Sequence, residues 1–240
     1  MDPAVTSRAL YVAGAHTDIG KTHVACALIR AARAHGVSCD VFKPVLSGFD
    51  PARWEESDAG RLLDALGRGR ADLDAISPLR FAAPLAPPLA ARREGVRLEM
   101  ADILDRCRTW LAESPAQLKL LEGAGGLMSP IAEDGTALDL PERLALPSIL
   151  VGGAYLGAVS HMLTALEVMR TRRLPVLALV VSQDADARAP DFAETVELVR
   201  KFVGMLPVVS VRRGDERPWA EALLSLVPDA PRQGELSRSD

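Results

Sequence analysis

The sequence predicts an α/β fold, a mostly parallel sheet with helices on both faces. Short apolar runs bounded by turn residues alternate with helical patterns of ten or more residues, which is the order of βαβ units. A glycine-rich segment separates the first apolar run from the first helical pattern. With 240 residues, 48% of them hydrophobic, we expect one domain over residues 1–227 and a polar, flexible tail over residues 228–240.

The expected strands are apolar runs that end at turn residues. Parallel strands are buried on both faces and therefore read as nearly continuous apolar segments. Ligands of such sheets sit beyond the carboxyl ends of the strands, so the residues that follow each run are candidates for a site. The runs lie at residues 10–13, 39–42, 117–121, 148–151, 176–181 and 205–209.

The expected helices lie between these runs. A proline-rich segment at residues 78–88 cannot be helical throughout, and we expect it to be an ordered surface loop. The helical patterns cover residues 21–35, 57–66, 99–112, 158–170 and 192–203, and a last one covers 219–226.

Residues 14–22 read Gly-Ala-His-Thr-Asp-Ile-Gly-Lys-Thr and stand between a strand and a helix. This context is typical of a phosphate-binding loop, or P-loop, and predicts a P-loop NTPase-like fold. Lys21 would reach the β- and γ-phosphates of a nucleotide, and the Thr22 hydroxyl would bind Mg²⁺. The strict pattern has four residues between its glycines, whereas five separate Gly14 from Gly20, so Ala15 takes the first position.

Two polar clusters follow the second strand. Lys43 and Ser47 leave the strand toward the ligand edge, where they could hold anionic groups, although Lys43 taken alone could equally be a solvated surface lysine. Asp58 follows Ser57, a plausible N-cap, so Asp58 either compensates the helix dipole or binds Mg²⁺.

Two more clusters follow later strands. Glu122 ends an apolar run before Gly123, and burying this carboxylate without a cation would be costly, which favours a metal ligand over a simple tight turn. Gly157 and Ser160 begin a helix, a natural site for a carboxylate or phosphate. His161 in the same segment is more often a packing or capping residue than a catalytic one.

The composition argues against several classes of protein. The net charge is −4 with no basic block, so we expect no nucleic-acid partner. Three widely spaced cysteines indicate reduced thiols rather than disulfides or a zinc site, and no apolar leader is visible. Proline and glycines interrupt the longest apolar stretch, residues 144–159, so we expect a cytoplasmic protein that does not span a membrane.

These clusters, in this order, resemble the dethiobiotin synthetase family, ATP-dependent enzymes that close the ureido ring on the way to biotin. The likeness covers about residues 10–209. It rests on the P-loop at 14–22, Lys-Pro-Val-x-Ser-Gly at 43–48, Ser-Asp at 57–58, Leu-Glu-Gly-Ala-Gly-Gly at 121–126 and Leu-Gly-x-x-Ser-His at 156–161.

The resemblance implies an activity and an assembly. The enzyme would carboxylate 7,8-diaminononanoate, a diamino carboxylic acid, with CO₂ or bicarbonate and close the ring, giving dethiobiotin, ADP and phosphate. It would use Mg²⁺ and form a homodimer, with the substrate at the interface between subunits.

The resemblance also implies roles for residues at matching positions. Lys21 and Lys43 would be catalytic, and Mg²⁺ would be held by Thr22, Asp58 and Glu122. The substrate would meet Thr17, Lys43 and Ser47 and the partner subunit's helix start, represented by Gly157, Ala158 and Ser160. Adenine would lie near Gln183, Leu206, Pro207 and Val208, and the other ATP contacts would be Asp18, Ile19, Gly20, Lys21, Thr22, His23, Asp58, Glu122, Gly123, Ala124 and Gly125.

Three positions depart from the family pattern. His16 replaces an Asp or Asn of the loop, Gln183 replaces an Asn that reads adenine, and Gln117 replaces an acidic residue. The change at Gln183 leaves the choice between ATP and CTP open. The sequence also leaves open the chain length of the diamine.

The rival interpretations are another amido-ligase of the same superfamily, a ParA-like ATPase switch and a nucleotide-binding module without catalysis. The amido-ligases usually carry a further domain for which this chain is too short. The switch would need a lysine near the start of the P-loop, and positions 14–19 contain none.

Overall fold

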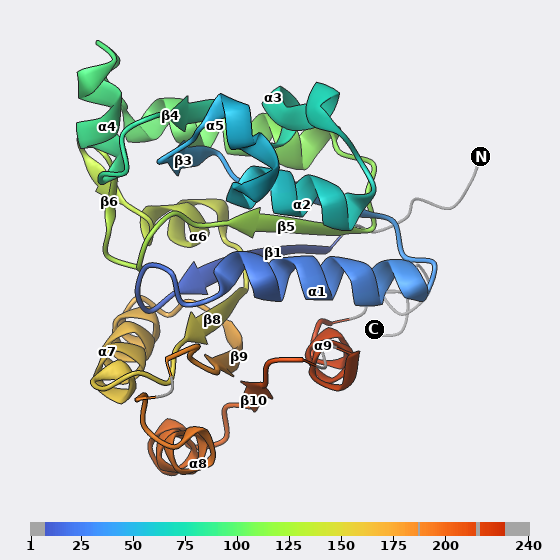
Figure 1. Cartoon of the computed structure of the whole chain (residues 1–240), viewed down its shortest axis with the longest axis vertical. Coiled ribbons are helices and arrows are strands. Elements are labelled where there is room, and N and C mark those ends of the chain that lie inside the picture. The colour runs from blue at the N-terminus through green and yellow to red at the C-terminus, as the bar shows by residue number, and fades with distance from the viewer. Residues whose placement is uncertain (1–7, 187, 215–216, 229–240) are drawn as a thin grey trace, which may run out of the picture.

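A six-stranded parallel sheet forms the centre of the molecule in the computed structural model, which describes residues 8–186, 188–214 and 217–228. The strand order is β10-β9-β8-β1-β5-β2, so the strand that leads into the P-loop lies inside the sheet (Figure 1). This confirms the predicted fold class. The strands are β1 (Arg8–Gly14), β2 (Cys39–Phe42), β5 (Leu118–Glu122), β8 (Ser148–Gly152), β9 (Val176–Ser182) and β10 (Val208–Val211).

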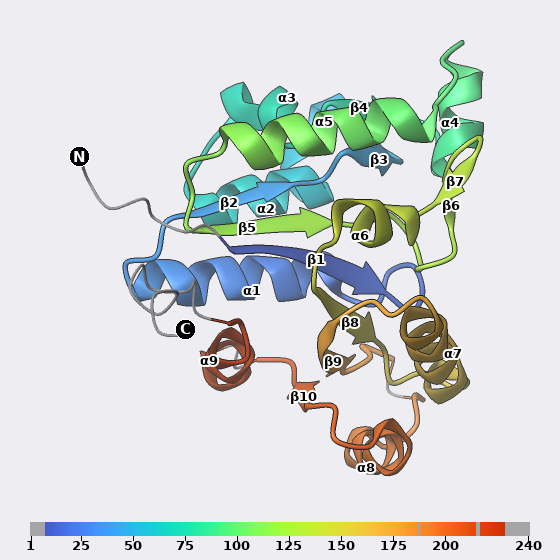
Figure 2. The same cartoon turned by 180° about the vertical axis from the view of Figure 1, so that it is seen from behind.

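Helices cover both faces of the sheet, as Figures 1 and 2 show from opposite sides. One face carries α1 (Lys21–Ala34), α2 (Asp58–Leu66), α3 (Leu73–Ile76) and α9 (Arg217–Ser225). The other carries α4 (Pro87–Arg93), α5 (Met100–Glu113), α6 (Asp139–Leu144), α7 (Ala158–Thr171) and α8 (Phe192–Val203). Two short 3₁₀ helices, η1 (Pro51–Glu56) and η2 (Arg70–Asp72), precede α2 and α3.

The strands divide their side chains between two apolar cores. In β1, Leu10 and Val12 join the core under α1, whereas Tyr11 and Ala13 join the core under α5 and α7. This alternation follows from the two-residue period of a strand. Because both faces are covered, the inner strands are apolar at nearly every position.

The prediction of a simple surface loop at residues 78–88 is wrong in part. Strand β4 (Leu79–Phe81) pairs in parallel with β3 (Val45–Ser47), and α4 begins at Pro87. Proline suits the first helical turn, where its missing N–H would have no helical acceptor. The hairpin of β6 (Pro130–Ala132) and β7 (Gly135–Thr136) was not predicted either, because such short strands form only where a partner lies beside them.

The other predicted elements end within two residues of the observed ones, except β10. This strand runs over Val208–Val211 rather than 205–209, after Pro207, which lacks an N–H for the ladder. Met205 is 99% exposed. The predicted tail falls almost wholly on residues 229–240, outside the described ones. No helix in the described part of the chain combines the length and apolar character needed to cross a membrane.

Candidate active site

The P-loop leaves the carboxyl end of β1 and turns tightly into α1. A Cβ on Gly14 would lie 2.8 Å from Lys21 Cδ and 3.0 Å from the Gly125 carbonyl oxygen, so no larger residue fits there without a shift. Gly20 has a φ of 95°, a conformation that glycine adopts readily. The loop is thereby folded close to the backbone that follows β5.

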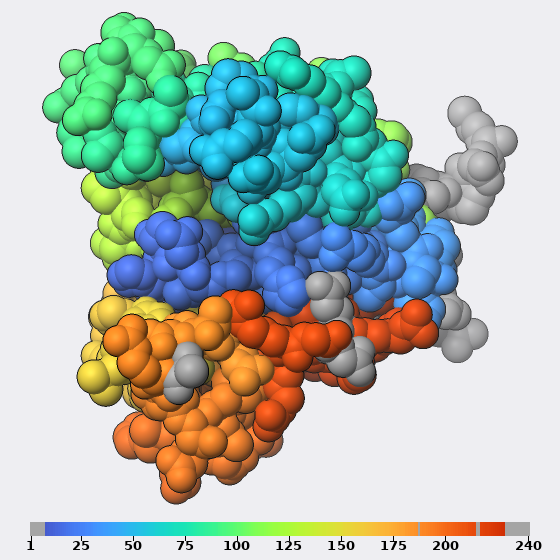
Figure 3. Space-filling view, in the orientation of Figure 1, coloured from blue at the N-terminus to red at the C-terminus, as the bar shows by residue number. Residues whose placement is uncertain are grey.

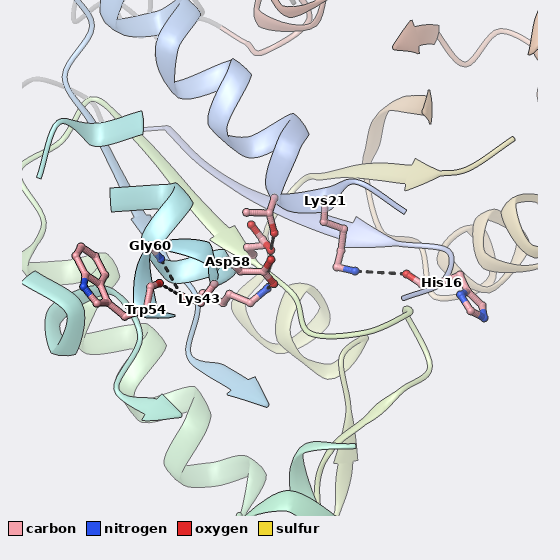
Figure 4. A network of polar contacts seen from close by, with 9 residues as sticks. His16, Lys21, Lys43, Trp54, Asp58 and Gly60 are labelled. Carbon is pink, nitrogen blue, oxygen red and sulfur yellow. Dashed lines mark hydrogen bonds and ion pairs between the residues drawn. The ribbon is translucent and has the colours of Figure 1, made fainter. Parts of the chain in front are cut away.

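Lys21 lies along the P-loop, with Nζ 3.4 Å from the His16 carbonyl oxygen (Figure 4). Burial first, and then the nearby positive charge of Lys43, lower the pKa of Lys21 to about 8. Its ammonium is therefore incompletely compensated by the protein. A bound anion would supply the missing negative charge.

Lys43 follows β2 and lies between two carboxylates (Figure 4). Its Nζ is 2.6 Å from Glu122 Oε1 and 2.7 Å from Asp58 Oδ2. Burial opposes the charge of Lys43, but the two carboxylates outweigh it and raise the pKa of Lys43 above its usual value. The side chain is 2% exposed, so the alternative of a solvated surface lysine is wrong.

Asp58 is presented by the first turn of α2. Ser57 caps this helix, accepting a hydrogen bond from the Gly60 N–H at 3.1 Å, as its N-cap position predicts. The capping function therefore belongs to Ser57, and the Asp58 carboxylate faces Lys43. Burial would raise the pKa of Asp58, but Lys43 lowers it to about 2, so this group is ionised at neutral pH.

Glu122 is fully buried at the carboxyl end of β5. Its Oε1 accepts hydrogen bonds from Thr22 Oγ1 and Lys43 Nζ, both at 2.6 Å. Its Oε2 is buried and has no hydrogen-bond partner among the described residues. A buried carboxylate oxygen without a donor is costly, so this atom marks a place where a cation or donor would be favourable.

The oxygens available to a metal are the carboxylates of Asp58 and Glu122 and the hydroxyl of Thr22. Within the described residues, no three or more His, Cys, Asp or Glu side chains are placed so that they could hold a metal ion by themselves. Hard oxygen donors of this kind suit Mg²⁺, which is commonly bound by one or two carboxylates together with phosphate oxygens.

A cavity of about 730 Å³ opens beside this cluster, bordered by the P-loop and by the segments after β9 and β10. In Figure 3 the blue P-loop region and the orange segments adjoin on one face of the molecule. Of the residues predicted for ATP or substrate, those lining the cavity are Thr17, Asp18, Ile19, Gly20, Lys21, Thr22, His23, Asp58 and Gln183.

Leu206, Pro207 and Val208, which were predicted to lie near adenine, do not line the cavity. These residues stand at the amino end of β10, where Leu206 and Val208 pack against the core under α5 and α7. The carboxyl end of the strand leads instead to Arg212, Arg213 and Gly214, which line the cavity. The carboxyl-end rule for parallel strands would have found them, had the strand been assigned three residues later.

Gln183 joins the segments after β9 and β10. Its backbone N–H donates to the Val211 carbonyl at 2.9 Å, and its side-chain Oε1 accepts from the Arg213 N–H at 3.1 Å. The amide of Gln183 is thus held in the wall of the cavity with its carbonyl oxygen already engaged.

The glycine-rich segment after Glu122 supports the P-loop and does not line the cavity. The Gly123 N–H donates to the Val12 carbonyl at 3.2 Å, and the Leu127 N–H donates to the Gly14 carbonyl at 2.7 Å. Ala124 is half-buried, and Gly125 has a φ of 68°. This segment therefore holds the P-loop in place through backbone hydrogen bonds.

The predicted substrate residues fall in separate places. Thr17 lines the cavity, whereas Ser47, at the end of β3, does not. Gly157, Ala158 and Ser160 form the start of α7, with Gly157 and Ser160 exposed and Ala158 buried. Leu156 beside them is 89% exposed. A helix start this open to solvent can receive an anion from another molecule.

A family model described as an AAA domain matches residues 8–212. The chain is 62% identical to the ATP-dependent dethiobiotin synthetase BioD of Phenylobacterium zucineum, covering 89% of this chain and 92% of that protein. It is 53% identical to the ATP-dependent dethiobiotin synthetase BioD of Caulobacter vibrioides strain NA1000, with coverages of 86% and 93%. The identity to the protein of the same name from Anaeromyxobacter dehalogenans strain 2CP-C is 43%, with coverages of 83% and 90%.

More distant solved structures share the fold. A DUF1611 family protein from Anabaena variabilis superposes with a TM-score of 0.54 at 16% identity, covering 92% of this chain and 57% of that one. A ParA family ATPase from Chlorobium tepidum gives a TM-score of 0.51 at 14% identity, with coverages of 92% and 90%. At this level of identity the likeness concerns the P-loop NTPase fold alone.

Proposed function

Because the chain belongs to the dethiobiotin synthetase family, we propose that it makes dethiobiotin from 7,8-diaminononanoate, CO₂ and ATP, as a ligase of biotin biosynthesis. Many ATPases share a P-loop, so the loop alone does not carry this proposal. The observation that carries it is the buried Lys43 ammonium, held by Glu122 and Asp58 beside the P-loop. A ParA-like switch leaves this second lysine unexplained.

The cavity supports an ATP site. Its volume of about 730 Å³ suits a nucleotide, and Lys21 together with the N-terminus of α1 offers positive charge to the phosphates. The base would lie at the far side of the cavity, between Gln183 and the segment of Arg212 and Arg213. These residues replace Leu206, Pro207 and Val208 as candidates for contact with the base.

The donor set supports a Mg²⁺ requirement. The orphaned Oε2 of Glu122 and the ionised Asp58 carboxylate would hold the ion together with the Thr22 hydroxyl. When bound, Mg²⁺ would offset charge on the phosphate oxygens of ATP. Since Lys43 already shares Glu122 Oε1 with Thr22, the free oxygen is the one that can serve a metal without breaking these contacts.

The chemistry proposed for the site balances without a protein nucleophile. One substrate amine adds to CO₂ and gives a carbamate with loss of a proton. A carbamate oxygen then attacks the γ-phosphorus, ADP leaves, and the second amine displaces phosphate to close the ring. Lys43 and Lys21 would stabilise negative charge on the carbamate and on the transferred phosphoryl group, so positioning and electrostatics account for most of the catalysis.

Substrate binding is proposed to need two subunits. Thr17 and Ser47 would contact the diamine from one subunit, and the start of α7 at Gly157, Ala158 and Ser160 would receive its carboxylate from the other. The exposure of this helix start and of Leu156 supports a surface that another copy covers. We also propose a homodimer in the cytoplasm.

The proposal is tested by phosphate release from ATP with bicarbonate, with and without 7,8-diaminononanoate, and by mass spectrometry of the product. Release that depends on the diamine and yields dethiobiotin is expected, and it should stop when a chelator removes Mg²⁺. Release that ignores the diamine but responds to DNA would overturn the assignment in favour of a ParA-like switch. Competition by CTP in the same assay decides the nucleotide preference.

A further inference from the structure

Three aromatic side chains lie together at the edge of the cavity, away from the ion pairs of Lys43 with Glu122 and Asp58. His16 and His161 stack with their ring centroids 5.3 Å apart and an angle of 6° between the ring planes. Tyr155 is tilted against both, at 5.9 Å from His16 and 5.7 Å from His161. The proposed binding of ATP, Mg²⁺ and the diamine gives no role to these three side chains.

The rings join two segments that are far apart in the sequence. His16 belongs to the P-loop, whereas Tyr155 lies between β8 and α7 and His161 lies in the first turn of α7. Gly153 makes room for this arrangement, because a Cβ there would lie 2.8 Å from the Tyr155 ring. The stack therefore spans from the phosphate site to the helix start assigned to the substrate carboxylate.

Polar contacts fix the orientation of each ring. The Tyr155 hydroxyl lies 2.7 Å from His161 Nδ1, and His16 Nδ1 lies 3.0 Å from the Thr17 carbonyl oxygen. A carbonyl oxygen only accepts, so His16 Nδ1 carries the hydrogen in this contact. Both histidines are exposed, which means that core packing does not hold them in place.

The backbone of His16 also contacts a residue of the proposed ATP site. Its carbonyl oxygen accepts from Lys21 Nζ at 3.4 Å, and the neighbouring Ala15 N–H donates to the Val151 carbonyl at 2.8 Å. A movement of His16 would therefore change the position of the Lys21 side chain. A movement of His161 would likewise shift the first turn of α7.

We propose that His16, Tyr155 and His161 form a clasp that positions the P-loop against the start of α7, so that ATP binding in one subunit and binding of the diamine carboxylate at the interface with its partner depend on one another. His16 is a positioning residue in this account, since it acts through the loop and through α7. The inference rests on the proposed function for the identity of the second ligand. Its first part, the effect on ATP affinity, can be measured without any turnover.

The test is a double-mutant cycle of His16→Ala, His161→Ala and the double variant. Each single variant should raise the KM for ATP and for 7,8-diaminononanoate by roughly two- to tenfold, the range of an aromatic pair, with kcat changed less than twofold. The double variant should be no worse than the worse single one. His16→Phe, which keeps a ring without the imidazole, should restore most of the loss.

Controls separate this clasp from general damage. His35→Ala removes an exposed histidine that pairs with Glu221 at 2.7 Å, and it should leave both KM values unchanged. Additive effects in the cycle, or a His16→Phe variant as poor as His16→Ala, would overturn the proposal. The same cycle is run on the Kd for ATP by calorimetry, so the clasp is tested even if the wild-type protein makes no dethiobiotin, which would refute the proposed function instead.

Discussion

Two buried carboxylates on neighbouring strands differ in how fully the protein satisfies them. Asp40 in β2 receives four hydrogen bonds, from Arg68, Val41, Trp110 and Ser114, at 2.8 to 3.1 Å. Glu122 in β5 receives two on Oε1 and none from the described residues on Oε2. The described residues thus satisfy the hydrogen-bonding capacity of the Asp40 carboxylate and leave that of the Glu122 carboxylate incomplete.

The difference separates a structural role from a functional one. A satisfied buried carboxylate contributes to stability and offers nothing to a ligand. An incomplete one is a cost to the folded state that a ligand can remove, and such costs gather at active sites. We therefore expect mutations around Asp40 to change stability and mutations around Glu122 to change activity.

The largest effect is expected for Lys43→Gln, which removes the ammonium between Glu122 and Asp58. Loss of one fixed charge aimed at the reacting group lowers kcat by about 100- to 1,000-fold. The loss of kcat is measured as the rate of dethiobiotin formation. Lys119→Gln is the matched control, because Lys119 is also buried in the sheet but donates, among the described residues, only to the Leu111 carbonyl, at 2.7 Å. Equal losses of activity in both variants would contradict the comparison.

Lys21, like Glu122, is a buried charged group that the protein does not fully compensate. The pH dependence of stability tests this. Burial and Lys43 lower its folded-state pKa from 10.5 to about 8. Between these values the unfolded chain holds more protons than the folded protein, so stability rises with pH over this window. The Lys21→Met variant lacks this rise, which amounts to on the order of 2 to 3 kcal/mol.

Urea unfolding of the nucleotide-free protein at pH 7 and pH 10 measures the Lys21 effect as the difference between wild type and variant. Other lysines titrate in both proteins and cancel in this difference. An identical dependence on pH in the two proteins would show that Lys21 is not held at a lowered pKa.

The smallest effect is expected for Trp110→Phe. Phenylalanine keeps the stacking on Phe42, whose ring centroid lies 5.3 Å away, and removes only the indole N–H that donates to Asp40 at 3.1 Å. The free energy of unfolding should fall by about 1 kcal/mol, the usual value of one such bond, without loss of activity. Unfolding and turnover are both measured, and a loss of activity with unchanged stability would speak against a structural role for the Asp40 cluster.

The sequence predicted the elements that carry a strong local pattern. The helix over Phe192–Val203 and the strand over Cys39–Phe42 were predicted with their observed ends, because their apolar periodicity and flanking turn residues agree. The β3–β4 pair was missed, because three-residue strands have no pattern of their own and depend on the chain that lies beside them.

The site was predictable where a residue follows a strand with a clear pattern. Lys43, Asp58 and Glu122 meet within hydrogen-bond distance because the carboxyl ends of β2 and β5 share one edge with the start of α2. The segment that we propose for the base differs from the one expected from the sequence, since β10 begins three residues later than its apolar run suggested. The His16–His161 stack joins residues 145 positions apart in the chain, a contact that no local pattern encodes.

The most direct test compares Glu122→Gln with Asp40→Asn, measuring dethiobiotin formation and the free energy of unfolding for both. Asp40→Asn should lower the free energy of unfolding by about 1 to 3 kcal/mol and leave kcat within twofold. Glu122→Gln should lower kcat at least about 100-fold, and its loss of activity should exceed what its change in the free energy of unfolding explains, since Asp58 still pairs with Lys43. Full activity in Glu122→Gln, or an inactive but fully stable Asp40→Asn, would contradict the account.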